Sequence, residues 1–150
     1  MQEKMLQVKI DGKEKTYREG TRYLDAAQEF QKYADSRIVL ASVNGRLKEL
    51  TKKMKDGEEI CLLTLKDKNG FMTYRRSMIL LMLKAVYTVG GFELVDRVGV
   101  HYSVGSGFYV TISGEKKTEL TFLKQVEQTM REMVEKKLPI TKTSISTDEA

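Results

Sequence analysis

The stretch IVLASVNGRLKELTKKMKDGEEICLLTL, residues 38–65, decides the fold of the first half of the chain. Its first six residues, 38–43, form an apolar run that predicts a buried strand. Asn44-Gly45 follows, and this pair favours a tight hairpin turn because both residues accept a positive φ. After a second turn at Asp56-Gly57, residues 60–65 are apolar at nearly every position, as expected of a strand in the middle of a sheet.

Toward the N-terminus, the sequence predicts a β-hairpin and one amphipathic helix. Residues 6–10 alternate between apolar and polar, and Asp11-Gly12 turns the chain into a second strand that ends near Tyr17. Thr21 can cap a helix whose apolar positions share one face. These positions are Tyr23, Ala26, Ala27, Phe30 and Tyr33. The predicted order is therefore ββαβ(β)β, with one helix covering a small sheet.

This order, together with the turns at 43–46 and 56–57, resembles the TGS domain, a ubiquitin-like β-grasp module. TGS domains are found at the N-terminus of threonyl-tRNA synthetases, in stringent-response synthetases and in some GTPases. The resemblance covers about residues 5–65 and implies a regulatory or ligand-sensing part rather than a catalyst, although one fold hosts many functions. We expect a first domain over residues 1–66.

The second half predicts another α+β unit. A polar stretch at 66–70 is expected to link the two. A long helix is expected from about Thr73 to Gly90-Gly91, and because it is apolar nearly all round from Met78 to Tyr87, it is interpreted as the buried axis of the second domain. Two alternating runs, 98–104 and 108–112, flank Gly105-Ser106-Gly107 and predict a hairpin.

A further helix is expected to open at Thr118 or Thr121 and to end before Pro139. Its predicted apolar face consists of Leu123, Val126, Met130, Met133 and Val134. A strand is expected at 140–145, and the capping-box pattern at 146–149 announces another helix, which suggests a piece of a longer protein. The predicted fold class is α+β: a β-grasp domain followed by a partial α+β domain over 71–150.

Several runs in this half resemble the second domain of threonyl-tRNA synthetases, which hydrolyses mischarged tRNA. These runs are residues 73–77, 107–109, 130–134, 138–140 and 147–150. In that family the long helix carries two histidines four residues apart, on one helical face. Here the matching positions are Arg76 and Leu80, and the family's later Cys-x-x-x-His element would fall beyond Ala150. The resemblance therefore implies degenerate editing positions, with no catalytic residue and no metal site in this chain.

The helix start Tyr74-Arg75-Arg76-Ser77 is also similar to the N-terminal region of bacterial nucleoside kinases of the uridine kinase type. That resemblance implies a non-catalytic regulatory region whose parent protein uses ATP and Mg, and whose partner is the parent's own kinase domain. No GxxxxGK[ST] phosphate-binding loop occurs in the 150 residues. The alternative is an RNA-binding module related to threonyl-tRNA synthetase that has lost editing chemistry. A small molecule and RNA are the candidate ligands.

Arg75 and Arg76 are the candidate phosphate or RNA contacts, because they are expected at the first turn of the long helix, where free N–H groups attract anions. The basic cluster Arg46, Lys48, Lys52, Lys53 and Lys55 is interpreted as a solvated sheet edge. His101 is expected to point outward from its strand, and Cys61 is expected in the core rather than as a nucleophile.

Composition limits the remaining possibilities. The net charge of +5 allows polyanion binding, although acidic residues are interleaved with the basic ones. The single cysteine excludes an internal disulfide, so the cytoplasm is the expected compartment. No apolar run approaches the roughly 20 residues needed to cross a bilayer, so no membrane contact is expected.

Overall fold

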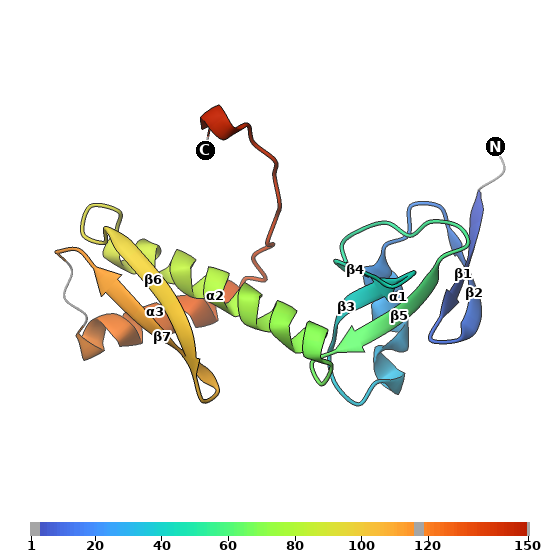
Figure 1. Ribbon diagram of the computed structural model, residues 1–150, viewed down its shortest axis with the longest axis horizontal. Helices are drawn as coiled ribbons and strands as arrows, with labels where there is room; N and C mark the ends of the chain where they lie inside the picture. The colour runs from blue at the N-terminus through green and yellow to red at the C-terminus, as the bar shows by residue number, and fades with distance from the viewer. Residues whose placement is uncertain (1–3, 116–118, 150) are drawn as a thin grey trace. The chain divides into compact units, whose positions relative to one another are not determined.

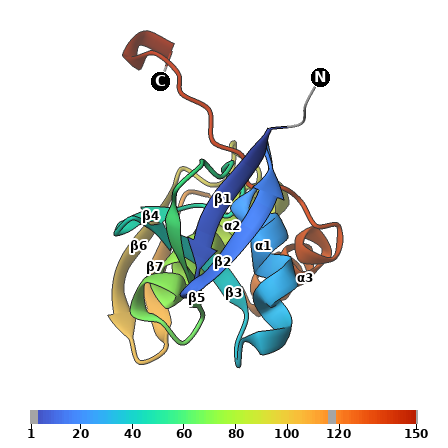
Figure 2. The same cartoon turned by 90° about the vertical axis from the view of Figure 1, so that its right-hand side faces the viewer.

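The computed structural model describes residues 4–115 and 119–149, and it has the predicted α+β fold. The chain divides into two compact units, Met1–Ser77 and Met78–Ala150 (Figures 1 and 2), called unit 1 and unit 2 below. The division falls inside helix α2, Lys68–Gly90. The expected domain boundaries at residues 66 and 71 stay a prediction.

Unit 1 is a five-stranded mixed sheet with one helix. Its elements are β1 Met5–Ile10, β2 Lys13–Arg18, α1 Tyr23–Phe30, η1 Gln31–Tyr33, β3 Ile38–Val43, β4 Arg46–Lys48 and β5 Glu59–Thr64. The strand order is β2-β1-β5-β3-β4, in which β1 and β5 are parallel and the other neighbours antiparallel. The strand over 59–64 is central, as its apolar sequence predicted. This is the β-grasp arrangement expected from the sequence.

Hydrophobic burial holds α1 against the sheet. Tyr23, Ala26, Ala27 and Phe30 are buried along one side of the helix, and they pack with alternate residues of β1 and β5 and with buried residues of β3. The helix is shorter than predicted, because Tyr33 lies in the 3-10 turn η1 and is 68% exposed. The expected Thr21 cap is also wrong. The Thr21 hydroxyl donates to the Arg18 carbonyl, whereas Asp25 accepts from the Arg22 N–H at 2.8 Å.

Cys61 does not lie in the core. β5 alternates, so that Ile60 and Leu62 point into the core while Cys61 is exposed on the other face of the sheet. Partial desolvation and the nearby Asp11 carboxylate raise the pKa of the Cys61 thiol. A raised pKa disfavours the reactive thiolate, so Cys61 makes a poor nucleophile even at the surface.

The polar stretch 66–70 is not a linker, because α2 begins at Lys68 rather than near Thr73. The Asp67 carbonyl accepts the first helical bond, from the Phe71 N–H at 2.8 Å, and the Asp67 carboxylate accepts from the N–H and hydroxyl of Thr64, at 2.7 and 2.9 Å. Gly70 then lies so close to β5 that an added Cβ would be 2.0 Å from the Thr64 carbonyl oxygen. Polarity alone therefore misidentified the first turn of α2, whose glycine is required by close contact rather than flexibility.

Unit 2 consists of the later part of α2, the hairpin of β6 Arg97–Val104 and β7 Gly107–Ser113, and helix α3 Leu120–Glu135. The buried side chains that form its core are Ala85, Val86, Val95, Phe122, Val126 and Met133. The hairpin and its turn are as predicted. Helix α2 is not buried all round, however, since Leu80 is 50% exposed. It ends as predicted, with Gly91 at φ +75°.

The buried face of α3 matches the predicted one in part, since Val126 and Met133 are buried and Met130 is partly buried. Phe122 is buried, whereas Leu123 and Val134 are 45% and 60% exposed. The helix begins after Glu119, and the alternative start at Thr118 lies outside the described residues. It ends before Pro139 because Lys137 adopts φ +51° and the N–H of Leu138 bonds the Met133 carbonyl, a Schellman motif.

The C-terminal segment is less regular than predicted. Residues 138–146 form no strand, so the expectation for 140–145 is wrong, and only a 3-10 turn, Thr147–Glu149, follows. The apolar residues Ile140 and Ile145 are each 60% exposed, so no packed face orders this segment. Among the described residues, no helix is both long and apolar enough to cross a membrane.

Candidate anion-binding surface

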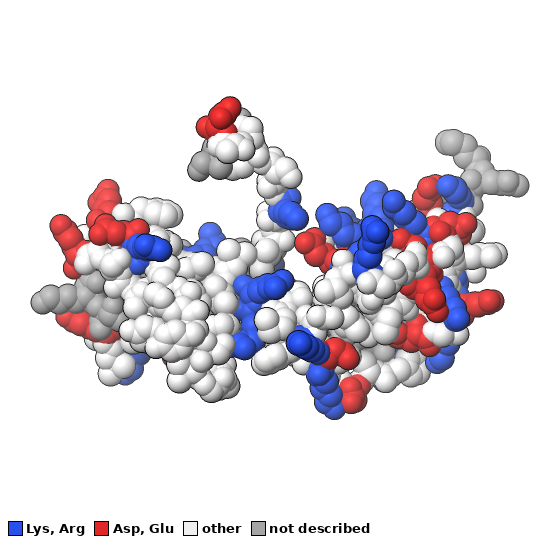
Figure 3. Space-filling view, in the orientation of Figure 1, with Lys and Arg blue, Asp and Glu red and all other residues white. Residues whose placement is uncertain are grey.

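A shallow hollow of about 410 Å³ opens on unit 1 where β4 leads into the loop before β5. Its lining residues are Leu47, Lys48, Glu49, Lys52, Lys53 and Lys55. Four of the six lining residues are lysines and one is a glutamate. The hollow is therefore more basic than the rest of the chain, where acidic and basic residues are interleaved. Figure 3 shows Lys and Arg gathered over part of unit 1. We call these six residues the lysine hollow.

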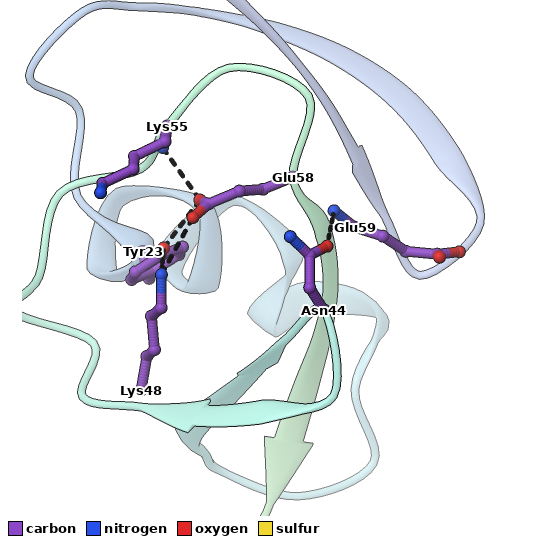
Figure 4. Close-up of polar contacts among 6 residues, drawn as sticks. All are labelled: Tyr23, Asn44, Lys48, Lys55, Glu58 and Glu59. Carbon is purple, nitrogen blue, oxygen red and sulfur yellow. Dashed lines mark hydrogen bonds and ion pairs between the residues drawn. The ribbon is translucent and has the colours of Figure 1, made fainter.

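A buried carboxylate fixes one wall of the lysine hollow. Glu58 is only 5% exposed, and its carboxylate accepts from the Tyr23 hydroxyl at 2.7 Å, the Lys48 ammonium at 2.9 Å and the Lys55 N–H at 2.9 Å (Figure 4). Lys48 also donates to the Tyr23 oxygen at 3.2 Å. A buried charge is tolerated only when it is paired and hydrogen-bonded, and Glu58 meets both conditions.

The electrostatics of this network keep both partners charged. Burial by itself would raise the pKa of Glu58, but the hydrogen bonds from Lys55, Tyr23 and Lys48 outweigh burial and lower that pKa. The hydrogen bond to Glu58 raises the pKa of Lys48. Lys48 is therefore engaged by Glu58, and the charges facing solvent belong mainly to Lys52, Lys53 and Lys55.

Backbone hydrogen bonds hold the loop that carries these three lysines. The Lys52 carbonyl accepts from the Tyr23 N–H at 3.0 Å, and the Met54 N–H donates to the Thr21 carbonyl at 2.8 Å. Met54 itself is buried in the core of unit 1. On the far side of Glu58, Asn44 accepts from the Glu59 N–H at 2.9 Å and pins the hairpin turn (Figure 4). The lysines therefore extend from a fixed backbone.

The chemistry available here is anion binding. Lysine ammonium groups attract phosphates as point charges, and their pairing with phosphate releases counterions. The contact between Lys52 and Glu49 is 3.9 Å long and exposed, so it competes weakly with an incoming anion. Among residues 4–115 and 119–149, no three His, Cys, Asp or Glu side chains gather as a metal site would require. The lysine hollow is therefore suited to binding anions.

The sequence placed the strongest anion site elsewhere, at Arg75 and Arg76. Because α2 begins at Lys68, these residues lie about two turns inside the helix, and the free N–H groups of its first turn are not beside them. The expectation that Arg75 and Arg76 lie in the first turn of the helix is therefore wrong. Phosphate contact through their guanidinium groups stays a prediction. Arg75 lies over the Phe71 ring, with 5.7 Å from its Cζ atom to the ring centroid.

Arg76 and Leu80, the degenerate editing positions, are four residues apart on α2 and therefore share one helical face. Both side chains are exposed. Neither an arginine nor a leucine can act as a general base or metal ligand near neutral pH. The expected absence of editing chemistry stays a prediction from these two side chains.

His101 is exposed on β6, as predicted, and its Nε2 atom lies 2.8 Å from the Thr111 hydroxyl.

Glu58, whose hydrogen bonds fix one wall of the lysine hollow, was not predicted from the sequence. It sits in the mixed run Lys55-Asp56-Gly57-Glu58-Glu59, where all charges look solvated. Only the tertiary approach of Tyr23 and Lys48 distinguishes Glu58 from Glu59.

Comparison with known proteins finds similarity to threonine–tRNA ligases along nearly the whole chain. The chain is 33% identical to the enzyme of Thermotoga petrophila over 148 residues, which are 97% of the chain and 22% of the enzyme. It is 32% identical to the Thermotoga maritima enzyme over the same length, and 27% identical to the Staphylococcus aureus enzyme over 140 residues. No protein family profile matches the chain.

The chain thus spans about a fifth of the length of the curated relatives it matches. The chain is similar to one region of these threonine–tRNA ligases, and the similarity fits the β-grasp fold of unit 1. These relatives give no support to a uridine kinase parent. That parent stays a hypothesis, based on the sequence Tyr74-Arg75-Arg76-Ser77 in α2.

Proposed function

We propose that this chain is an RNA-binding module related to threonyl-tRNA synthetase that does not perform editing chemistry. The observation that carries the proposal is the lysine hollow, in which Lys52, Lys53 and Lys55 extend from a loop fixed by the buried Glu58. Three solvent-facing ammonium groups on one fixed loop fit the regularly spaced phosphates of a nucleic acid backbone better than a single small anion. The relatives are named for ligating threonine to tRNA, which makes tRNA the first RNA to test.

The test is a binding titration of fluorescently labelled, unfractionated tRNA with the chain and its variants. Replacing Lys52, Lys53 and Lys55 by alanine should weaken binding at least about tenfold at low salt, because each lost phosphate contact removes released counterions. The matched control replaces Lys9, Lys13 and Lys32, which are also exposed and also in unit 1, and it removes the same charge. If the two triple variants lose the same tRNA affinity, net charge alone attracts tRNA and the lysine hollow is not the binding site.

Arg75 and Arg76 belong to the same proposal as secondary contacts. A double alanine variant should weaken tRNA binding less than the lysine variant does, because the two guanidinium groups no longer have the help of a helix N-terminus. A larger loss than that of the lysine variant would move the main RNA contact to α2.

The absence of editing is tested separately, by incubating the chain with serylated threonine tRNA. The proposal requires no hydrolysis above the rate without protein, because Arg76 and Leu80 replace the histidines of the family pattern. Hydrolysis by this chain would show a catalytic group that the proposal does not contain.

The parent protein is a separate question, and the sequence Tyr74-Arg75-Arg76-Ser77 keeps a nucleoside kinase parent as the second candidate. A regulatory region in front of a kinase would use the same fold without needing RNA. The reading frame after Ala150 distinguishes the two candidates. A GxxxxGK[ST] motif after a strand supports the kinase, and a synthetase catalytic domain excludes it.

A further inference from the structure

The outer face of the β6–β7 hairpin carries an exposed cluster of aromatic side chains. On β7, the half-buried Phe108, Val110 and Ile112 alternate with the exposed Tyr109 and Thr111. Ile112 packs against the core of unit 2. Because successive side chains of a strand point to opposite faces, Tyr109 and Thr111 point away from that core.

A β-bulge adds two further rings to the same face. Val100 pairs with Val110 and Ser103 pairs with Phe108, so two residues of β6, His101 and Tyr102, oppose the single residue Tyr109. The Tyr102 and Tyr109 rings are stacked, with centroids 5.3 Å apart and planes at 21°. The His101 ring lies 5.5 Å from the Tyr109 ring. The bulge thus gathers three rings side by side.

These rings face solvent in an ordered arrangement. Tyr102 is 62% exposed and Tyr109 is 47% exposed. The hydrogen bond between His101 and Thr111 fixes the imidazole beside them. Exposed aromatic area of this kind is unusual unless it meets a ligand, since burying such rings is strongly favourable.

The charge of the hairpin suits an anionic ligand. β6 and β7 contain no Asp or Glu, although the chain has 21 acidic residues, and their charged or titratable cations are Arg97 and His101. Alternation along β6 places Arg97 on the same face as His101, opposite to the half-buried Val98 and Val100. In Figure 3 the surface around β6 and β7 shows few charged side chains. Flat aromatic rings on a hairpin whose two strands carry an arginine and no carboxylate fit a stretch of single-stranded RNA, with bases at the rings and a phosphate at Arg97.

We propose that this face binds unpaired nucleotides of RNA, with a base continuing the stack of Tyr102 and Tyr109 and the phosphate of another nucleotide near Arg97, which lies about 13 Å along β6 from His101. The inference rests on the proposed RNA-binding function and adds to it the class of nucleotide recognised. Base pairs in a duplex are stacked on one another and cannot present their faces to a ring, so the site selects single strands. Stacking also predicts weak dependence on base sequence.

The first test measures binding of a labelled 12-nucleotide oligo(A) strand and of the same strand annealed to oligo(U). Replacing both Tyr102 and Tyr109 by alanine should weaken single-strand binding at least about fivefold and leave duplex binding unchanged. Replacing both by phenylalanine should preserve single-strand binding, because the rings remain. Tyr33→Ala, which removes an exposed tyrosine of unit 1, is the matched control and should have no effect.

The second test uses His101, the only histidine of the chain, whose ring protons give unambiguous NMR signals. A base stacked beside Tyr109 should shift these signals upfield when oligo(A) is added, and the alanine variant should show a smaller shift.

The outcomes separate this inference from the proposed function. If the tyrosine-to-alanine variant binds single strands as tightly as the wild type while the lysine variant is weakened, the stacking face is wrong and the RNA-binding function stands. If the wild-type chain binds neither tRNA nor oligo(A), both proposals are wrong. If the alanine variant of Tyr102 and Tyr109 binds single strands more weakly and the phenylalanine variant binds them as tightly as the wild type, the inference is supported.

Discussion

Unit 1 and unit 2 differ in how completely their described residues enclose a core. In unit 1 a five-stranded sheet and α1 surround thirteen buried apolar side chains, whereas in unit 2 a two-stranded hairpin, α2 and α3 surround six. Unit 1 also keeps a buried, fully hydrogen-bonded carboxylate at Glu58. Unit 2 instead leaves aromatic rings on its hairpin exposed. The difference indicates that unit 1 is the stable scaffold, and that unit 2 has less stability in reserve.

The largest expected effect is on unit 2. Phe122→Ala removes a ring that is 2% exposed and packs beside Gly90 and the core of unit 2. We expect a loss of about 3–5 kcal/mol, enough to unfold this small core while unit 1 stays folded. Hydrogen exchange measured peptide by peptide should show loss of protection across the hairpin and α3 of unit 2, with the sheet of unit 1 still protected. Leu123→Ala, at the exposed neighbouring position, is the control, and equal losses would contradict the described face of α3.

In unit 1 the corresponding change is Ile60→Ala, on the central strand β5. Ile60 is 1% exposed, so we expect a loss of about 2–5 kcal/mol in the free energy of unfolding of unit 1. Because its core is larger, unit 1 should remain folded without denaturant and unfold at lower urea concentration. Cys61→Ala, the next residue on the same strand, should change the free energy by less than about 0.5 kcal/mol. A large loss of stability in Cys61→Ala would contradict the exposed position of Cys61.

Glu58→Gln tests the buried network. The amide can still accept hydrogen bonds but no longer neutralises Lys48, so we expect unit 1 to lose about 1–3 kcal/mol at pH 7. Glu59→Gln is the control, because Glu59 is exposed and its contact with Lys9 is 3.4 Å long. If both variants lose the same stability, burial of Glu58 contributes nothing.

The same network predicts a dependence of stability on pH. The folded pKa of Glu58 is below its unfolded value of about 4.3, so its contribution is complete above that pH and is lost as the pH falls through the folded pKa. Urea unfolding of unit 1 between about pH 6 and pH 2 should therefore show a smaller acid loss in Glu58→Gln than in the wild type. Parallel profiles would show that other carboxylates cause the acid sensitivity.

The smallest effect is expected at the end of α3. Lys137 has φ +51°, a conformation that costs a residue with a Cβ atom about 1 kcal/mol relative to glycine. Lys137→Gly should therefore stabilise unit 2 by up to about 1 kcal/mol, measured as a shift of its thermal midpoint. Lys136→Gly provides the contrast, because Lys136 has φ −70° and glycine there should destabilise the helix end.

The sequence predicted those parts of the fold in which local pattern and tertiary environment agree. The turn at Asn44-Gly45, the central strand 59–64 and the hairpin of β6 and β7 follow from turn residues and alternation, and all are present. The predictions failed where a distant contact decides the outcome. The first turn of α2 was interpreted as a polar linker, because the local sequence does not indicate that Gly70 packs closely against Thr64.

The candidate site shows the same limit. The lysines of the hollow were identified as a cluster, but they were interpreted as a solvated edge. The buried Glu58 that fixes their loop has the same local sequence character as the exposed Glu59. Arg75 and Arg76 were favoured instead, because an error of five residues in the start of α2 placed them at a helix terminus. Helix starts are the least certain part of such predictions, and here the site depended on one.

The most direct test of the central claim is the salt dependence of tRNA binding by the wild-type chain and the variant lacking Lys52, Lys53 and Lys55. We predict that the logarithm of the wild-type affinity falls linearly with the logarithm of the KCl concentration. The slope of the variant should be shallower by about 2 to 3, the range expected when three phosphate contacts are lost. Salt-independent binding, or slopes that are equal in the two proteins, would contradict the assignment of the lysine hollow as an RNA-binding surface.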